Sequence, residues 1–182
     1  MDYKNYFKDY SEAIYSLLNE IDTNLINKSV EIINNVNHTN NTTYIVGNGG
    51  SASIASHVSV DFAKVAKVNS KTFNNANLIT CFANDFGYEN WVKEAIKANC
   101  SNSDLLILIS SSGRSPNIIN AAKYCKENSI KLITLSGFSR ENELSKLGDV
   151  NFHVNSEVYN YIEMAHHIIL VSIVDIFAKK IL

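Results

Sequence analysis

The sequence predicts an α/β fold in which a central five-stranded parallel sheet lies between layers of helices. From residue 44 onward, short apolar runs alternate with stretches of helical periodicity, which is typical of right-handed βαβ units. Residues 105–109 are apolar at every position, as expected for a strand buried on both faces. The predicted architecture is therefore a three-layer sandwich.

The expected elements follow in order along the chain. Apolar residues at helical spacing predict two helices, over 3–20 and 22–36, as a helical N-terminal extension that packs on the core or on a neighbouring subunit. The predicted strands are 44–46, 71–73, 105–109, 132–135 and 150–154. The remaining predicted helices are 52–67, 88–99, 116–128, 140–147 and a long C-terminal helix over 159–181. That last helix is apolar nearly all round, so we expect it to be buried in the domain or against another subunit.

Composition excludes several classes of protein. With 182 residues, 46% hydrophobic and 19% charged, the chain has the size and composition of one globular domain over 1–182. A net charge of −2 without a Lys/Arg cluster argues against a nucleic-acid partner. The first five residues lack the build of a signal peptide, and the longest apolar stretch, 168–177, is short for a membrane span and contains Asp175. Three widely spaced cysteines predict reduced thiols, so we expect a cytoplasmic protein with no membrane partner.

A glycine-rich turn, Gly47-Asn48-Gly49-Gly50-Ser51, separates the first predicted strand from a helix. Its glycines permit positive φ and a close approach of backbone N–H groups to a ligand, and the helix N-terminus adds the positive end of its dipole. Ser51 is placed to cap that helix or to bind an anion. The turn matches neither G-x-G-x-x-G nor the Walker pattern. It predicts a site for a phosphate ester, with a plain strand-to-helix turn as the alternative.

A serine-rich turn follows the strand 105–109 and ends at Pro116, which we expect in the first turn of the next helix. Its hydroxyls come from Ser110, Ser111, Ser112 and Ser115. Because ligands of parallel sheets bind at the carboxyl ends of the strands, the two turns are expected to form one anion site. Ordinary loop chemistry is the alternative for the serines. Between the turns, Asp85 is expected either to cap a helix beginning near residue 88 or to meet substrate hydroxyls.

Two pairs of titratable residues have i,i+4 spacing on predicted helices: His57 with Asp61, and Glu163 with His167. Each pair suits metal binding or general acid–base chemistry. If the pairs meet, two histidines and two carboxylates would form a site for zinc or another divalent ion. The alternative for each pair is a salt bridge within the helix or a core histidine. His166 leaves the helix about 100° from His167, so both cannot face one site equally.

The glycine turn followed by His57, the segment Asn84-Asp85-Phe86-Gly87 and the serine turn together resemble the sugar isomerase (SIS) domain family over nearly the whole chain. Within that family they are most similar to phosphoheptose isomerases, which interconvert sedoheptulose 7-phosphate and D-glycero-D-manno-heptose 7-phosphate through an enediol. The resemblance implies a flavodoxin-like SIS fold, a phosphorylated sugar as substrate, zinc as a cofactor, and a homotetramer with active sites at subunit interfaces. The product would serve lipopolysaccharide or capsule biosynthesis.

The resemblance also implies residue roles. The four serines would hold the phosphate, and the substrate would contact Asn48, Gly49, Gly50, Ser51, Asp85 and Glu163. Asp61 occupies the place of the family's catalytic glutamate, which is one methylene longer. On the last helix, Glu163 takes the place of a glutamine and Val171 that of the acid histidine. Since Val171 has no acid or ligand chemistry, His167, one turn earlier on the same face, is expected to replace the missing acid.

Two alternatives to a phosphoheptose isomerase stay open. One is an isomerase of a different sugar phosphate, and the other is a non-catalytic SIS protein that acts as a sugar-phosphate sensor or a protein-binding module. The phosphate turns fit all three. The changed acid and base favour the alternatives, whereas the retained set of histidines and carboxylates favours an enzyme.

Overall fold

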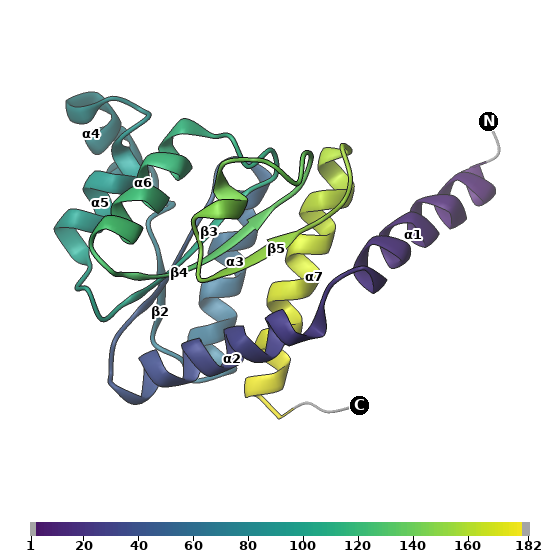
Figure 1. Ribbon diagram of the computed structural model, residues 1–182, viewed down its shortest axis with the longest axis horizontal. Helices are drawn as coiled ribbons and strands as arrows, with labels where there is room; N and C mark the ends of the chain where they lie inside the picture. Colours follow the sequence, from purple (N-terminus) through teal and green to yellow (C-terminus); the bar gives the residue numbers. More distant parts are fainter. Residues whose placement is uncertain (1–2, 180–182) are drawn as a thin grey trace.

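The computed structural model describes residues 3–179 and shows a five-stranded sheet with helices on both faces (Figure 1). The strands are β1 (Thr43–Val46), β2 (Ser70–Thr72), β3 (Leu105–Ser110), β4 (Lys131–Ser136) and β5 (Val150–His153). They pair in the order β2-β1-β3-β4-β5, and every pair is parallel. The predicted α/β class and all five predicted strands are therefore confirmed.

The helices are α1 (Tyr3–Asn19), α2 (Thr23–His38), α3 (Gly50–Lys64), α4 (Ala76–Phe86), α5 (Trp91–Asn99), α6 (Pro116–Glu127) and α7 (Tyr159–Phe177). Helix α4 was not predicted, because it buries no residue and its asparagine-rich start resembles a loop. Asn75 caps that start by accepting a hydrogen bond from the Leu78 N–H at 2.8 Å. The helix predicted over 140–147 is wrong, since only a 3₁₀ turn forms at Leu144–Lys146. The predicted end of the last helix at residue 181 lies outside the described residues.

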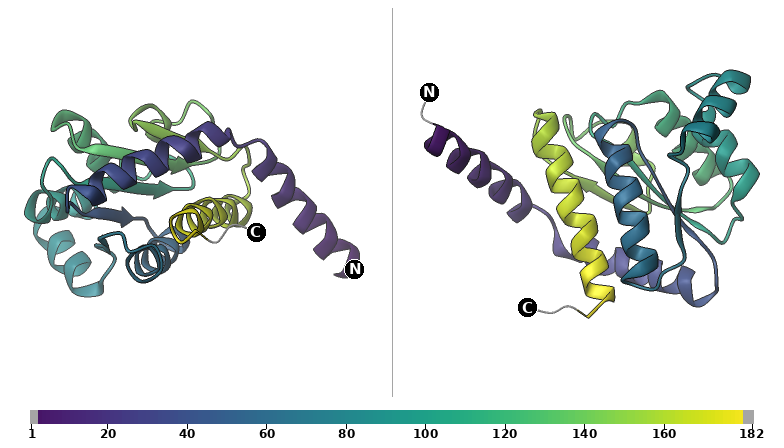
Figure 2. Two further views of the ribbon diagram at one scale, coloured as in Figure 1. Left: turned by 90° about the horizontal axis from the view of Figure 1, so that it is seen from below. Right: turned by 180° about the vertical axis from the view of Figure 1, so that it is seen from behind.

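The sheet separates two apolar clusters, and alternate residues of β3 contribute to each. Leu105, Ile107 and Ile109 pack with α2, α3 and α7, whereas Leu106 and Leu108 pack with α5 and α6. This alternation follows from the two-residue period of a strand, and it explains why β3 is apolar throughout. Helices α3 and α7 lie side by side on one face (Figure 2), where they form the most extensive helix pair of that layer.

Helix α7 is, among the described residues, the one helix long and apolar enough to cross a membrane by length and composition. Its buried side chains, from Ile162 to Val174, pack in the same cluster as α2 and α3, as those of a core helix do. Met164 and Ile168 on its other side remain 41% and 42% exposed. The expected burial is thus confirmed for one side of α7 only.

Helix α1 projects from the body of the molecule (Figures 1 and 2) and buries none of its residues. Its contact with α7 includes an edge-on ring pair between Tyr10 and Tyr161, with centroids 4.8 Å apart. Tyr3, Phe7 and Tyr15 are 75%, 70% and 68% exposed. An arm with this many exposed aromatic side chains has the composition of a protein-binding surface.

Candidate active site

The glycine turn and the serine turn meet in a cavity of about 130 Å³ at the carboxyl ends of β1 and β3. Its lining is mostly hydroxyl and amide groups, contributed by Asn48, Ser51, Ser110, Ser111, Ser112 and Ser115, with Ile109 below them and Tyr159 and Glu163 from α7. The sequence predicted that these two turns would form one site, and the structure brings them together. A larger hollow of about 360 Å³ lies around Lys131 and Asp149, at the amino end of β4, and contains none of these groups.

The glycine turn has the backbone that the sequence predicted. Gly49 has φ of +54° and caps the N-terminus of α3, a conformation that side chains disfavour. A Cβ on Gly47 would lie 2.7 Å from the backbone of Ser51, so the turn closes tightly. The prediction that Ser51 caps the helix is wrong, because the cap lies two residues earlier, at Gly49, and the helix starts at Gly50. Ser51 lies instead in the wall of the cavity, 3% exposed.

The serine turn contains a buried hydroxyl without a partner. Ser111 Oγ makes no hydrogen bond with the described residues, although Ser111 is only 6% exposed. Ser110 Oγ donates to Ser115 Oγ at 3.1 Å, and Pro116 opens α6 as predicted. A buried hydroxyl normally has a partner, so the orphan at Ser111 indicates a site where a ligand supplies one. The N-termini of α3 and α6 add N–H groups and favourable dipoles for an anion.

Asn48 is held by hydrogen bonds to two side chains that the sequence did not predict at the site. Its side-chain amide exchanges two hydrogen bonds of 2.9 Å with the amide of Asn117, which is 1% exposed. The Tyr88 hydroxyl donates to Asn48 Oδ1 at 3.2 Å. These contacts occupy the oxygen and one N–H of Asn48, which leaves one N–H to face a ligand. The polar position of Asn117, directly after Pro116, was the signal available in the sequence.

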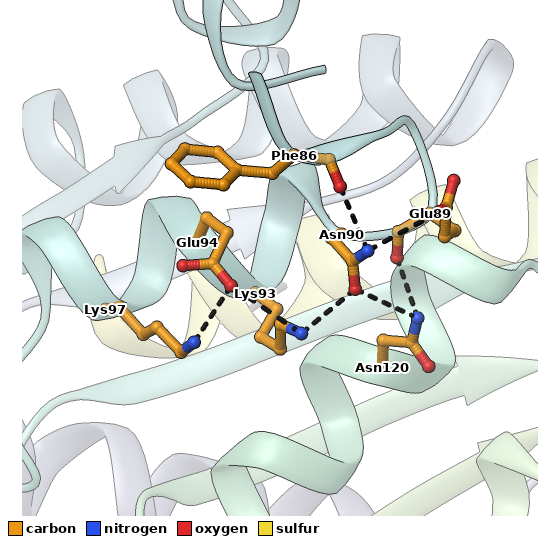
Figure 3. Close-up of polar contacts among 7 residues, drawn as sticks. All are labelled: Phe86, Glu89, Asn90, Lys93, Glu94, Lys97 and Asn120. Carbon is orange, nitrogen blue, oxygen red and sulfur yellow. Dashed lines mark hydrogen bonds and ion pairs between the residues drawn. The ribbon is translucent and has the colours of Figure 1, made fainter. Parts of the chain in front are cut away.

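The segment that carries Tyr88 is fastened to α5 and α6 (Figure 3). Asn90 Nδ2 donates to Phe86 O at 3.0 Å, and Lys93 Nζ donates to Asn90 Oδ1 at 3.0 Å. From α6, Asn120 Nδ2 donates to Glu89 O at 2.9 Å. This network fixes the turn between α4 and α5, and through Tyr88 it reaches the cavity.

Asp85 is not among the described residues that line the cavity. It lies in the last turn of α4, where its Oδ1 accepts a hydrogen bond of 2.9 Å from Asn84 Nδ2. The prediction that it caps a helix near residue 88 is wrong, because α5 begins at Trp91. Its expected contact with substrate hydroxyls stays a prediction.

Three of the predicted titratable residues form a hydrogen-bonded array across α3 and α7. His57 Nε2 lies 3.1 Å from Asp61 Oδ2, and His57 Nδ1 lies 2.8 Å from His167 Nε2. With Asp61 ionised, His57 donates from Nε2, so its Nδ1 accepts a proton from His167 Nε2. Nδ1 of His167 is then the ring nitrogen that can exchange a proton. Burial lowers the pKa of His167, with a smaller contribution from His57, so the ring is neutral at pH 7.

The expected metal site does not form with this geometry. The donor set suits zinc, but among residues 3–179 no three His, Cys, Asp or Glu side chains come together as a metal-ligating group. Two nitrogens bound to one tetrahedral zinc at about 2.0–2.1 Å lie roughly 3.3 Å apart. The facing nitrogens of His57 and His167 are closer, at 2.8 Å, and share a proton instead. Glu163 is directed elsewhere, into the serine-lined cavity.

Glu163 places a carboxylate in the wall of the cavity. Its carboxylate packs directly on Gly50, where a Cβ would overlap it. Partial burial raises the pKa of Glu163 above its ordinary value. Tyr159, one turn earlier on α7, lines the same wall and was not predicted.

His166 belongs to the core. It is fully buried, and its Nε2 donates to Ser136 O at 3.1 Å. Burial lowers the pKa of His166 to about 4. The question left open by the adjacent histidines is thereby answered, since only His167 faces the array with His57.

Comparison with known proteins gives the family. The model of the SIS domain matches residues 5–137. This chain belongs to the SIS domain family. Phosphoheptose isomerase 2 of Campylobacter jejuni is 34% identical to it over 160 residues, which cover 81% of this chain and 78% of the relative. Phosphoheptose isomerase of Sulfurimonas denitrificans is 30% identical over 189 residues, covering 98% and 96%.

Among solved structures, phosphoheptose isomerase from Neisseria gonorrhoeae superposes with a TM-score of 0.88, covering 98% of this chain and all of that one at 20% identity. That similarity supports the SIS fold. It extends over the helical N-terminal extension and α7 as well as the sheet, because nearly the whole chain is covered.

Proposed function

We propose that this SIS protein is an aldose–ketose isomerase that converts sedoheptulose 7-phosphate to D-glycero-D-manno-heptose 7-phosphate. The observation that carries the proposal is the serine-lined cavity with its unpartnered buried hydroxyl at Ser111. The names of the relatives from Campylobacter jejuni and Sulfurimonas denitrificans support the reaction.

The cavity would hold the phosphate group rather than the whole substrate. Its volume of about 130 Å³ is below the roughly 300 Å³ of a typical ligand pocket, so the sugar would extend past the wall formed by α7. Hydroxyls and backbone N–H groups would bind the phosphate without a cationic side chain, with help from two helix N-termini. Asn48, held by Asn117, would offer its remaining N–H to a sugar oxygen.

Isomerisation through an enediol moves one proton between two carbons and one between two oxygens. We assign the oxygen-bound proton to His167, whose Nδ1 is the exchangeable end of the array with His57 and Asp61. The resemblance to the family assigns the carbon-bound proton to Asp61, whose carboxylate belongs to the same array through its contact with His57.

A divalent metal stays a prediction, and no step of this mechanism depends on it. The homotetramer also stays a prediction. It is supported by the exposed aromatic side chains of α1 and by the exposed apolar residues of α3 and α7, Val60, Met164 and Ile168. A cytoplasmic location and a role in lipopolysaccharide or capsule biosynthesis belong to the same proposal.

The test is an isomerase assay by NMR with sedoheptulose 7-phosphate, with unphosphorylated sedoheptulose as the matched control. We expect turnover of the phosphate ester and none of the free sugar, because binding depends on the phosphate cavity. No turnover with saturable calorimetric binding of the ester would refute the isomerase in favour of a sugar-phosphate sensor. Turnover of five- or six-carbon ketose phosphates in its place would identify a different substrate.

A further inference from the structure

Asn117 is a buried side chain that reaches the serine-lined cavity through another residue. It is 1% exposed and follows Pro116 in the first turn of α6. Its amide makes two hydrogen bonds of 2.9 Å, both with the side-chain amide of Asn48. Asn48 lines the cavity, whereas Asn117 is not among the described residues that do so. Any effect of Asn117 on a ligand in the cavity therefore passes through Asn48.

The glycine turn gives the Asn48 side chain little support of its own. Its neighbours Gly47 and Gly49 have no side chains, and a Cβ on Gly49 would meet no atom within 4 Å beyond its chain neighbours. The backbone of the turn is held separately, because Asn74 Nδ2 donates to Gly47 O at 2.8 Å and Asn74 Oδ1 accepts from the Gly47 N–H at 3.2 Å. Fixing the side-chain torsions of Asn48 costs conformational entropy, which the pair with Asn117 offsets before a ligand binds.

The pair also decides which atom of Asn48 is left for a ligand. Asn48 Nδ2 donates to Asn117 Oδ1, and Asn48 Oδ1 accepts from Asn117 Nδ2. The Tyr88 hydroxyl donates to the same Asn48 Oδ1 at 3.2 Å. Both lone pairs of this oxygen are then occupied, so Asn48 offers one N–H and no acceptor. A phosphate or sugar oxygen that accepts a hydrogen bond fits this arrangement.

Helix α6 supports both partners of Asn48. Asn117 lies in its first turn, and Asn120, three residues later on a neighbouring face, donates to Glu89 O and so holds the segment that carries Tyr88 (Figure 3). The residues that follow Asn117, Ile118 and Ile119, belong to the apolar cluster. An apolar side chain of similar volume would suit these surroundings, since replacing buried hydrogen-bonding groups by apolar ones can be nearly neutral for stability. Stability alone therefore does not account for an asparagine at position 117.

We infer that Asn117 is a positioning residue that fixes the Asn48 amide with its free N–H towards the ligand. The inference rests on the proposed function, because the ligand is the sugar phosphate of the same cavity. The role involves no proton transfer and no covalent bond. It requires a group at position 117 that donates to Asn48 Oδ1 and accepts from Asn48 Nδ2 at once. An amide or a protonated carboxyl group meets this requirement, whereas an ionised carboxylate or a hydrocarbon does not.

The test uses Asn117→Asp, because the carboxyl group has the size of the amide and its hydrogen bonding depends on pH. When ionised it only accepts, so one of its oxygens opposes Asn48 Oδ1. When protonated it donates to Asn48 Oδ1 and accepts from Asn48 Nδ2, which restores the pair. Burial should raise the pKa of this carboxyl group above the ordinary aspartate value of about 3.9.

Two further variants separate orientation from charge. Asn117→Leu removes both hydrogen bonds at every pH and adds no charge that could repel a phosphate. Asn102→Asp is the matched control, since it adds the same charge at an exposed residue shortly before β3, at the opposite edge of the sheet from the cavity. The melting temperature of each variant, measured at each pH, shows that the assayed protein is folded.

The readout is kcat/KM for sedoheptulose 7-phosphate between pH 5 and pH 8, relative to the wild type at the same pH. We expect Asn117→Asp to lose about 5- to 150-fold at pH 8, the range for a buried polar group without its partner, and to recover as the pH falls. Asn117→Leu should lose a similar factor at every pH, and Asn102→Asp should equal the wild type. A purely structural role for Asn117 would not produce recovery at low pH.

Two results would overturn the inference. Wild-type values for Asn117→Leu would mean that the orientation of Asn48 does not matter, and a deficit of Asn117→Asp that stays the same at every pH would mean that the restored pair does not matter. If the wild type binds sedoheptulose 7-phosphate in calorimetry without turnover, the proposed isomerase fails, and the dissociation constants of the same variants decide the inference. If the wild type does not bind this sugar phosphate, both fail.

Discussion

Protonation of His166 should destabilise the folded protein between pH 7 and pH 4. This imidazole is fully buried, and its Nε2 donates to Ser136 O. Its Nδ1 has no partner among the described residues, and neither does the Nδ1 of His153, the histidine whose charge opposes protonation of His166. A proton added to His166 would therefore be buried without an acceptor and near a second ring.

The magnitude follows from linkage. The pKa of His166 is lowered from 6.5 to about 4 on folding, so the unfolded chain binds this proton more tightly than the folded one. The contribution to stability is complete above pH 6.5 and is lost as the pH falls. Relative to pH 7, protonation of this imidazole lowers the free energy of unfolding by about 2 kcal/mol at pH 5 and by about 3 kcal/mol at pH 4.

The assay is urea unfolding followed by circular dichroism from pH 5 to 7.5 at a fixed protein concentration, because assembly would shift the midpoint. His166→Gln is the matched variant, since its amide can still donate to Ser136 O and cannot be protonated. We expect wild-type stability to fall with decreasing pH by about 2 kcal/mol more than that of the variant. If the free energy of unfolding depends on pH in the same way for both proteins, the reasoning is refuted.

Three further predictions concern the site. Gly50→Ala should reduce turnover by up to about a hundredfold, because the new methyl group displaces the Glu163 carboxylate in the wall of the cavity. The melting temperature should not fall, since alanine favours the helix. Activity equal to that of the wild type would contradict the contact between Gly50 and Glu163. Ser111→Ala should weaken inhibition by phosphate about 10- to 100-fold, which corresponds to the loss of one hydrogen bond to a charged group. The free energy of unfolding should not fall, since the Ser111 hydroxyl has no partner in the described chain. Unchanged inhibition would mean that phosphate binds elsewhere. Chelator treatment followed by metal titration should leave kcat unchanged, because no step of the proposed proton transfers uses a metal. Activity restored by zinc would show that the predicted metal takes part and that the rings of His57 and His167 separate to bind it.

Much of the site was predictable because its signals are local. The glycine turn, the serine turn and Pro116 each depend on the conformation of a few consecutive residues, and the parallel sheet determines where such turns meet. Gly49 has the positive φ that the turn requires, and Pro116 begins α6. The helix cap expected at Ser51 was wrong by two residues, since the cap is Gly49, and this is the usual scale of error for a helix boundary.

Contacts between distant segments were not predictable in this way. Asn117 and Tyr88 meet Asn48 from two other elements, and neither belongs to a recognisable motif. The i,i+4 spacing predicted that His57 and Asp61 share one face of a helix, and that Glu163 and His167 share one face of another. Those spacings do not determine the relative axial position of α3 and α7.

The sequence alone determined the fold class, the family and the two turns that line the cavity, because periodicity and backbone requirements are encoded in neighbouring residues. Only the tertiary structure decided which of the four titratable side chains lie together and which one lies in the cavity. The packing of α3 against α7 brings His57 to His167 and leaves Glu163 over Gly50, in the cavity with the serines. Helix packing fixes such distances through side-chain volumes along the whole interface, and no short segment of sequence contains that information.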